Sequence, residues 1–483
     1  MTRIAPMDLS FLLLERANRP MHMAALTIFR KPKGGQSSFG PRLFDAYRHS
    51  QAVKPFDCKL KWLGKDVAAW ETVEPDMSYH VRHIALPAPG SMQQFYETIS
   101  FLNAGLLDRG HPLWECYLID GIENGCIAVM IKVHHALIDG EGGLRVMRNF
   151  LSDSPRDKTL AGPWMAAESA DKPRRSRPSV SQIERLQGML KGLTKLPGEF
   201  IGVGNDVIDL GAQSLNLKPR MANLPFTARP TLFNNTAKSG ARAYANIELP
   251  LADVKAVAKA TDTSVNDVVM TIIDDALHHY LGEHQVPTDK PLVAFMPMSL
   301  RDESGGGGGN QVSAELIPMG APEASISARL RQINNATKNA KDKVRGMQTT
   351  SRQAYALLLF GSLTMSDTLP WFGKVPSANL VISNMKGPTG QLYLAGAPMV
   401  VFTGLPILPP GAGLNVTFAS VNTDICLAIG AAPEAVHEPF RLAQLIEQAF
   451  HRLQADAGRA APRTAPASVS GTSTGQHRTR RTP

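Results

Sequence analysis

The chain has 483 residues, of which 43% are hydrophobic and 19% are charged, as in a globular protein with a large core. This length exceeds that of one ordinary domain, so we expect two. The formal net charge of +9 would suit a nucleic-acid-binding protein, but most of the excess lies in polar stretches at 171–177 and 456–483. We therefore expect no nucleic-acid-binding face on the folded core.

The cysteines and the apolar runs give expectations about localisation. Cys58, Cys116, Cys126 and Cys426 are scattered, without a CxxC pair or metal-finger spacing, which fits a reducing compartment. The sequence shows no signal-peptide pattern and no run of about 20 apolar residues that would span a bilayer. We expect a cytoplasmic protein, with peripheral attachment to the inner membrane or to lipid inclusions left open. Nothing in the sequence determines its oligomeric state.

Two shifts in composition divide the chain. A stretch rich in Ser, Pro, Ala and charge predicts a flexible linker, and the C-terminal stretch predicts a disordered basic tail. The parts between mix strand-like and helix-like runs, so each half is expected to form an α/β layer unit. The predicted segments are an N-terminal subdomain (1–152), the linker (153–181), an amphipathic helical connector (182–214), a C-terminal subdomain (215–456) and the tail (457–483).

The first half contains a predicted β-hairpin. Residues 115–122 alternate as a strand does and lead into Asn124-Gly125, a strong hairpin signal because both residues tolerate positive φ. Residues 126–133 then form a nearly continuous apolar run, as a buried strand should.

Polar residues follow at the end of the second strand, in the run from His134-His135 to Asp139-Gly140. A strand end beside a glycine-rich turn commonly presents functional groups. Because successive side chains on a strand point to opposite faces, only one of the two histidines can face a given cavity. A short helix is predicted to follow over residues 144–150.

A histidine at this place predicts acid–base chemistry. Imidazole is mostly neutral at pH 7 and accepts a proton. Acyl transfer to an alcohol needs such a base because a neutral hydroxyl is a weak nucleophile, and a positioned base supplies about 10²–10⁴-fold. The alternatives are a hydrogen-bonded core histidine and a metal ligand. Neighbours on opposite faces of a strand do not converge on one ion, and the sequence reveals no outside ligands.

Two later stretches leave alternatives open, and a third predicts a loop. Residues 183–196 are apolar at helical spacing with basic residues between, which predicts a helix that either packs across the two halves or rests on lipid. Residues 354–365 predict either a buried helix or part of an apolar channel mouth or membrane-docking patch. The glycines at 305–309 lack the Lys-Ser/Thr of a phosphate-binding loop and predict a mobile loop.

The HHxxxDG pattern at 134–140 is the signature of the CoA-dependent acyltransferase and condensation-domain superfamily. The surrounding segments narrow the resemblance from this superfamily to one family. Over most of residues 1–455 the chain resembles the bacterial wax ester synthase/acyl-CoA:diacylglycerol acyltransferase family. One segment departs from the family pattern, with Met385-Lys386 where a small apolar residue and Pro are more frequent. The segments that carry the resemblance are MDLSFLLLE (7–15), RPMHM (19–23), LLDRGHPLWE (106–115), VHHALIDGEGG (133–143), VNDVVM (265–270), PMSLR (297–301), GN (309–310) and SNMKGP (383–388).

The resemblance implies an α/β (α+β) fold of two chloramphenicol-acetyltransferase-like sandwich domains, joined by a crossover, with a channel between them. It implies an O-acyltransferase that moves a long-chain acyl group from acyl-CoA to a fatty alcohol, giving a wax ester, or to diacylglycerol, giving triacylglycerol. His135 would be the general base at mid-channel. The hydroxyl would attack the thioester directly, and acyl-CoA would be a substrate, with no bound cofactor and no metal.

The resemblance also assigns roles to neighbouring residues. Asp139 would face away from the substrates and pair with an arginine, for which Arg301 is the candidate, while Gly140 would allow a close turn. Asn266, with Asp267 beside it, would shape the channel or stabilise the oxyanion, which is worth about 10²–10³ in rate. From the residues alone, the two could equally form a helix N-cap pair.

Two other functions remain as alternatives. One is a condensation-type acyltransferase that takes its acyl group from a carrier protein. The run at 34–37 resembles a phosphopantetheine attachment site only superficially, because it lies too near the N-terminus to have the helical bundle that such a site requires. The other is a non-catalytic lipid-binding protein on the same scaffold, against which the intact HHxxxDG argues. Chain-length preference and the choice between fatty alcohol and diacylglycerol depend on the shape of the channel.

Overall fold

The structure is a computed structural model. It describes residues 1–4, 6–34, 36–64, 67–138, 146, 150–165, 225–299, 312–346, 355, 359–363, 375–385, 387–388 and 390–460.

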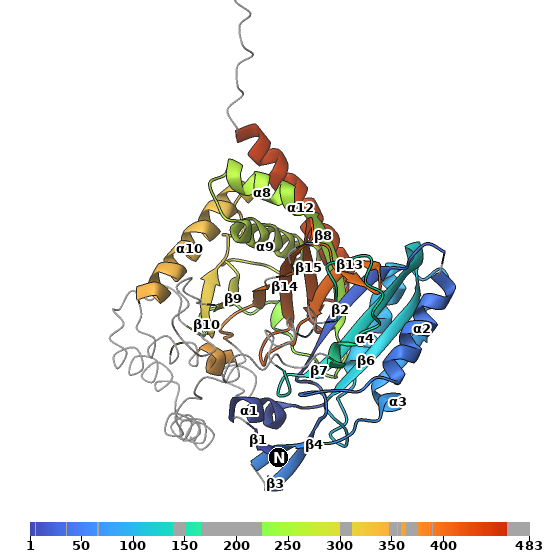
Figure 1. Ribbon diagram of the computed structural model, residues 1–483. Helices are drawn as coiled ribbons and strands as arrows, with labels where there is room; N and C mark the ends of the chain where they lie inside the picture. Colours follow the sequence, from blue (N-terminus) through green and yellow to red (C-terminus); the bar gives the residue numbers. More distant parts are fainter. Residues whose placement is uncertain are drawn as a thin grey trace, which may run out of the picture.

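Two six-stranded sheets form the body of the molecule (Figure 1). In the first, which we call the N-terminal sheet, all neighbours are antiparallel except the last pair, which is parallel. Its strands, in spatial order, are β12 (Tyr393–Leu394), β13 (Ala397–Leu405), β2 (His22–Arg30), β7 (Cys126–His134), β6 (Trp114–Ile122) and β5 (Val81–Ala85).

The second sheet, which we call the C-terminal sheet, is mixed. Its third strand is parallel to both of its neighbours, and the other pairs are antiparallel. Its strands, in spatial order, are β10 (Val312–Pro318), β9 (Val293–Ser299), β11 (Leu380–Met385), β14 (Leu414–Val421), β15 (Asp424–Ala431) and β8 (Ala243–Pro250).

Strands β12 and β13 cross from the C-terminal half into the N-terminal sheet. β13 pairs with β2 over a register that runs from Leu405 opposite Ala24 to Met399 opposite Phe29. The predicted subdomain 215–456 therefore contributes strands to both sheets, and the division at residue 215 does not separate them. Pairing between residues almost 400 positions apart leaves no local pattern, so the sequence could not reveal which strands cross.

A third, three-stranded sheet lies at the lower end of the molecule in Figure 1, beneath helix α1 (Pro6–Leu14). Leu12 of α1 shares one buried cluster with Leu60 and Ala68 of this sheet and with Ala136. Because Ala136 directly follows the two histidines, α1 and the small sheet pack against the turn at residues 134–138, which we call the histidine turn. The strands of the small sheet are β1 (Thr2–Arg3), β4 (Val67–Thr72) and β3 (Cys58–Gly64).

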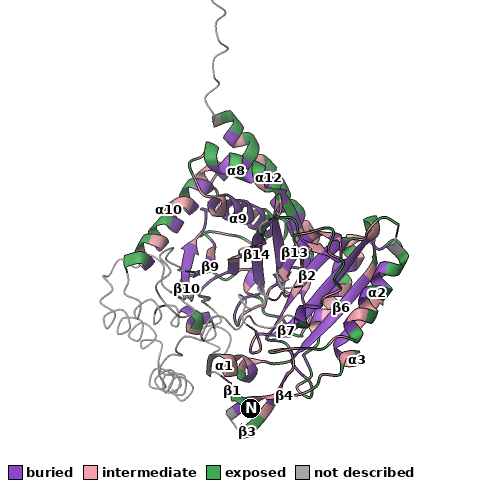
Figure 2. Ribbon diagram, in the orientation of Figure 1, coloured by how far each residue is buried: buried purple, intermediate pink, exposed green. Residues whose placement is uncertain are grey.

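Helices cover the sheets. α2 (Gln36–Arg48) packs through Leu43 on one face of the N-terminal sheet, and α4 (Met92–Ala104) packs through Phe95 on the other. Strand β7 is consequently buried along its whole length (Figure 2). The remaining helices are α3 (Met77–His80), α8 (Leu251–Ala260), α9 (Val265–Glu283), α10 (Ile326–Gly346) and α12 (Pro439–Ala460), with 3₁₀ turns η1 (Glu123–Gly125), η2 (Pro163–Met165) and η3 (Leu232–Asn234).

Several expected elements differ in their bounds. The hairpin forms as predicted, with φ of 59° at Asn124 and 67° at Gly125. The expected linker begins later than residue 153, because the Trp164 side chain is fully buried and its ring stacks 5.0 Å from that of Trp114. Helix α12 continues to Ala460, past the predicted start of the tail.

Other expectations fall wholly or partly outside the described residues. The connector at 182–214, the glycine run at 305–309 and residues 461–483 lie outside them, as does most of the helix expected at 144–150. Of the apolar stretch at 354–365, the described residues include Tyr355, Leu359 and Leu363, which are buried, and Phe360, which is 40% exposed.

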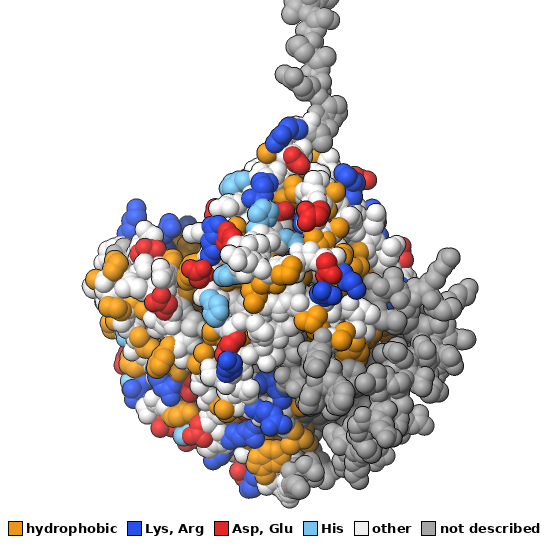
Figure 3. Space-filling model, turned by 180° about the vertical axis from the view of Figure 1, so that it is seen from behind, with side chains coloured by type: hydrophobic (Ala, Val, Ile, Leu, Met, Phe, Trp, Pro, Cys, Tyr) orange, Lys and Arg blue, Asp and Glu red, His pale blue; other side chains and the backbone are white. Residues whose placement is uncertain are grey.

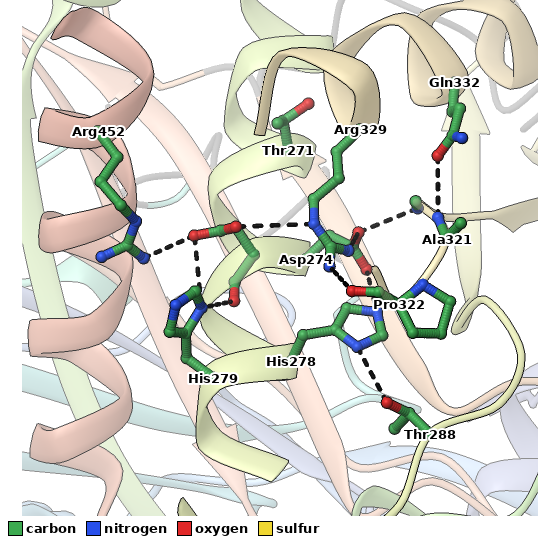
Figure 4. A network of polar contacts seen from close by, with 12 residues as sticks. Thr271, Asp274, His278, His279, Thr288, Ala321, Pro322, Arg329, Gln332 and Arg452 are labelled. Carbon is green, nitrogen blue, oxygen red and sulfur yellow. Dashed lines mark hydrogen bonds and ion pairs between the residues drawn. The ribbon is translucent and has the colours of Figure 1, made fainter. Parts of the chain in front are cut away.

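Carboxylates on α9 bind arginines from the two helices packed against it (Figure 4). Asp274 accepts hydrogen bonds from Arg329 of α10 at 2.6 Å and from the Gly320 amide at 3.0 Å. The neighbouring Asp275 pairs with Arg452 of α12 at 2.6 Å. Burial raises the pKa of Asp274 to about 7, although Arg329 and the Gly320 amide lower it. This network joins the three helices at the core of the C-terminal half.

We predict that Arg329→Met destabilises the protein by about 3–5 kcal/mol, because it leaves the buried Asp274 without its cationic partner and Asp275 with Arg452 alone. Arg329 is 3% exposed, whereas Arg441, paired with Glu283 across the surface, has a side chain 36% exposed. Arg441→Met is the matched control and should leave the free energy of unfolding nearly unchanged. Urea denaturation measures both; equal losses would contradict a structural role for the buried network.

Candidate active site

His134 is held by hydrogen bonds on its backbone and on its ring. Its N–H donates to the Leu113 carbonyl at 3.0 Å, and its carbonyl accepts from the Leu137 amide at 2.9 Å. Ring atom Nδ1 accepts from the Ala136 amide at 3.1 Å. The proton of the fully buried ring therefore sits on Nε2.

Nε2 of His134 faces Glu15, at the end of α1. It lies 3.3 Å from Oε1, in an alignment poorer than that of an ideal hydrogen bond, so the contact is mainly electrostatic. Oε1 also accepts from the Met21 amide at 3.1 Å, and Oε2 accepts from Arg109 Nη2 at 3.1 Å. The Glu15 side chain is 2% exposed.

These partners decide the charge of Glu15. Burial raises its pKa, but the opposing effects of His134, the Met21 amide and Arg109 are together larger. They bring the pKa of Glu15 down to about 2, so the carboxyl is ionised at neutral pH. A buried negative charge thus lies directly beside the histidine pair.

His135 follows on the turn and is half-buried. Its amide donates to the Met21 carbonyl at 2.9 Å, and its ring stacks on Phe11 of α1 with centroids 4.2 Å apart and planes 22° apart. The first histidine is thus enclosed in the protein, and the second is the one with partial access to solvent.

Further buried polar groups line the β2–β7 pair behind the turn. His22 lies opposite His134 in the register, and its Nε2 is 2.8 Å from the Asn103 carbonyl. Burial and the nearby Lys132 lower the pKa of His22 to about 3, so it is neutral. Burial also lowers the pKa of Lys132 to about 8.

Asn266 and Asp267 play different parts in the structure. Asp267 is N3 of a capping box whose N-cap is Ser264, with Oδ2 accepting from the Ser264 amide at 3.0 Å. Its Oδ1 accepts from Thr337 of α10 at 2.6 Å. Asn266 is half-buried, and its Oδ1 accepts from Asn384 of β11 at 3.5 Å. Asp267 therefore caps α9 and ties it to α10, whereas Asn266 joins α9 to the SNMKGP segment.

Met385, the departure in that segment, contacts the crossing strand. A Cβ at Gly404 of β13 would lie 3.1 Å from Met385 Cε, so glycine leaves the room that this side chain occupies. Met385 thereby bridges the C-terminal sheet and the strand that completes the N-terminal sheet.

Asp139, Gly140 and Arg301 lie outside the described residues, and so does the proposed pairing of Asp139 with Arg301. Within the described part of the chain, no three His, Cys, Asp or Glu residues are grouped to hold a metal ion. A cavity of about 110 Å³ lies at the β12 edge, lined by Phe150, Ser152 and Tyr393 among others, and not by the histidine motif. The channel between the sheets remains a prediction.

No function was predicted for Glu15, Phe11, Met21 or Arg109 from the sequence. All four belong to segments that carried the family resemblance, MDLSFLLLE, RPMHM and LLDRGHPLWE. A signal was present in Glu15, an acidic residue that ends an apolar run. Its partner could not be inferred, because the contact joins residues more than 100 positions apart.

Comparisons with known proteins identify relatives over almost the whole chain. The model of the wax ester synthase/diacylglycerol acyltransferase catalytic domain matches residues 4–269, and that of the WS/DGAT C-terminal domain matches residues 308–454. The probable diacylglycerol O-acyltransferase Tgs4 of Mycobacterium tuberculosis is 76% identical over 96% of this chain and 99% of its own length. The O-acyltransferase WSD of Acinetobacter baylyi is 30% identical over 87% of this chain and 90% of its own length.

Solved structures agree with these matches. The wax ester synthase/diacylglycerol acyltransferase from Marinobacter aquaeolei VT8 superimposes with a TM-score of 0.74 at 26% identity, over 95% of this chain and all of that one. The first condensation domain of the calcium-dependent antibiotic synthetase gives a TM-score of 0.55 at 12% identity, covering 95% of this chain and 97% of that one. The second likeness shows a shared two-domain fold and nothing about activity.

We predict that Asp267→Ala destabilises the protein and that Asn266→Ala does not. Asp267→Ala removes the capping-box acceptor and the Thr337 bond, which should cost about 1–3 kcal/mol in free energy of unfolding. Asn266→Ala should change that free energy by less than about 0.5 kcal/mol, because the side chain is half-buried and makes only weak contacts. Chemical denaturation of both variants is the measurement, and a larger loss for Asn266→Ala would contradict the assignment.

Proposed function

The chain belongs to the wax ester synthase/diacylglycerol acyltransferase family, and we propose that it transfers a long-chain acyl group from acyl-CoA to the hydroxyl of diacylglycerol or of a fatty alcohol. The name of the relative that is 76% identical supports diacylglycerol as the first acceptor to test. The observation that carries the proposal is the histidine turn, where His134 is fixed by Glu15 and the adjacent His135 is half-buried.

In the proposed mechanism, His135 accepts the hydroxyl proton of the acceptor as its oxygen attacks the thioester carbonyl carbon. The new C–O bond forms, the C–S bond breaks, and the imidazolium of His135 returns the proton to the departing CoA thiolate. No covalent acyl-enzyme forms. Asp139, paired with Arg301, would hold the turn from behind, and Asn266 is the candidate donor to the oxyanion.

A carrier-protein-dependent condensation enzyme and a non-catalytic lipid-binding protein remain the alternatives. The first shares the fold of this chain, and the second would need no base. If free acyl-CoA suffices as the acyl donor, the carrier-protein alternative is excluded. If replacing His135 abolishes function, the lipid-binding alternative is excluded.

We predict that the purified protein releases free thiol from palmitoyl-CoA when dioleoylglycerol or hexadecanol is added. His135→Ala should reduce the rate by about 10²–10⁴-fold, since the general base is lost. His111→Ala is the matched control, because His111 is also half-buried and stacked on an aromatic ring, that of Tyr79 at 3.7 Å, but lies outside the motif. It should keep nearly the full rate.

No release by the wild-type protein with either acceptor would contradict the proposed function and favour the carrier-protein or lipid-binding alternative. Equal rates for His135→Ala and wild type would be consistent with acyl transfer but would contradict the role of His135 as general base.

We also propose that the protein works at a lipid surface, since its acceptors are insoluble in water. In the described part of the chain no helix is long and apolar enough to cross a membrane. Near the histidine turn, Leu13 of α1 and Trp62 and Leu63 of β3 are 50%, 39% and 52% exposed. At this end of the molecule Figure 3 shows hydrophobic side chains beside Lys and Arg side chains. Apolar and aromatic side chains next to cations suit an anionic lipid–water interface.

We predict that the wild-type protein floats with vesicles of phosphatidylcholine and phosphatidylglycerol, and that replacing both Trp62 and Leu63 by Ser removes most of this binding. Phe101→Ser is the matched control, because Phe101 is 80% exposed but lies on α4. Density-gradient flotation measures the bound fraction. Equal flotation of the double variant and wild type would contradict this surface and leave the helix expected at 183–196, outside the described residues, as the candidate.

A further inference from the structure

We infer that Glu15 is a positioning residue that holds the histidine turn in the geometry His135 needs for proton transfer. The inference rests on the proposed function. It follows from the contacts that a single buried carboxylate makes with both histidines, one directly and one through Met21.

The direct contact fixes the first histidine. Nδ1 of His134 is occupied by the Ala136 amide, and Nε2 points to Oε1 of Glu15 at 3.3 Å. The ring therefore has one tautomer and one orientation. Because His134 and His135 are adjacent, the orientation of the first ring restricts the backbone that carries the second.

The indirect contact passes through Met21. Its amide donates to Oε1 of Glu15 at 3.1 Å, and its carbonyl accepts from the amide of His135 at 2.9 Å. Met21 is 2% exposed and immediately precedes β2. A movement of the Glu15 carboxylate would therefore displace the backbone of Met21, whose carbonyl binds the amide of His135.

The same helix also contacts the His135 ring. Phe11 and Glu15 are four residues apart, and the Glu15 amide donates to the Phe11 carbonyl at 3.1 Å, which continues the helical pattern of α1. Residues at this spacing lie on one face of a helix. α1 thus presents one aromatic ring to His135 and one carboxylate to His134.

The chemical environment of Glu15 supports a role beyond packing. A buried carboxylate is costly unless it is paired, and an apolar side chain would fill the space without that cost. Two partners of Glu15, His134 and the Met21 amide, contact its Oε1 and lead to the histidine turn. The third, Arg109, donates to its Oε2. In hydrolases and transferases that use a histidine base, a third group commonly orients that base. Here Glu15 would do so indirectly, through His134 and Met21.

Glu115 offers a matched control. It is another buried carboxylate, on β6 of the N-terminal sheet, with a side chain 9% exposed. It accepts from Tyr117 at 2.7 Å and lies 3.3 Å from Arg82 and 3.8 Å from Lys132. None of these partners is on the histidine turn. Glu115→Gln therefore makes the same chemical change at similar burial without touching that turn.

The test compares Glu15→Gln, Glu115→Gln and wild type in full-length protein, with palmitoyl-CoA and dioleoylglycerol. We expect Glu15→Gln to lower kcat by about 10–100-fold, the effect of a misplaced catalytic group. The KM for both substrates should change less than about threefold, because the binding surfaces are intact. Glu115→Gln should keep kcat within about threefold of wild type, with a melting temperature close to that of Glu15→Gln.

Equal kcat values for the two variants, or a loss that appears in KM alone, would overturn the inference. If Glu15→Gln does not fold, Glu15→Asp carries the test: it keeps the negative charge but draws the carboxylate back by one methylene from His134 and Met21, and a wild-type kcat in that variant would overturn the inference. An inactive wild-type protein would instead be the failure of the proposed function, so the two failures are distinguishable.

Discussion

The position of the site depends on the crossing of β13 from the C-terminal half into the N-terminal sheet. With β13 paired to β2, strand β7 lies inside the sheet rather than near its edge, and packing on both faces buries it from Cys126 to His134. A strand held on both sides and both faces has little freedom at its end. The histidine turn therefore emerges from a rigid element and is stabilised by both halves of the chain.

Helix α1 then determines what the two histidines can do. Glu15 holds the enclosed His134, while Phe11 stacks on the half-buried His135. The two adjacent residues of one motif thus have different environments and, in our account, different tasks: the first maintains the geometry and the second moves the proton. The pair is asymmetric because His134 is the last residue of the buried strand β7, whereas His135 is the first residue of the turn that follows.

Local features of the fold followed from the sequence, and long-range ones did not. The hairpin at Asn124-Gly125 and the end of the buried strand at His134 were predicted because turn chemistry and apolar runs act on neighbouring residues. The crossing of β13, the burial of Trp164 and the contact of Glu15 with His134 were not predicted. Each joins segments 50 or more positions apart, and no periodicity in a single sequence records such contacts.

The site residues likewise divide into those that the sequence indicated and those that only the structure revealed. The family resemblance indicated the motif and its base, whereas Asp139, Gly140 and Arg301 lie outside the described residues, and their roles stay predictions. The interpretation of Asn266-Asp267 as an N-cap pair was wrong in position, because α9 begins at Val265 with Ser264 as its N-cap, and Asp267 is the N3 residue of that capping box. The residues that hold the histidines came from the structure alone.

The central claim, that His135 removes the acceptor proton, is tested most directly by varying the acidity of the acceptor. Hexadecanol and a long-chain alcohol fluorinated beside its hydroxyl-bearing carbon would be compared in wild type and His135→Ala. A more acidic hydroxyl depends less on a base, so the account predicts that the loss caused by His135→Ala is much smaller with the fluorinated alcohol. The same fold loss with both alcohols would contradict general-base catalysis by His135.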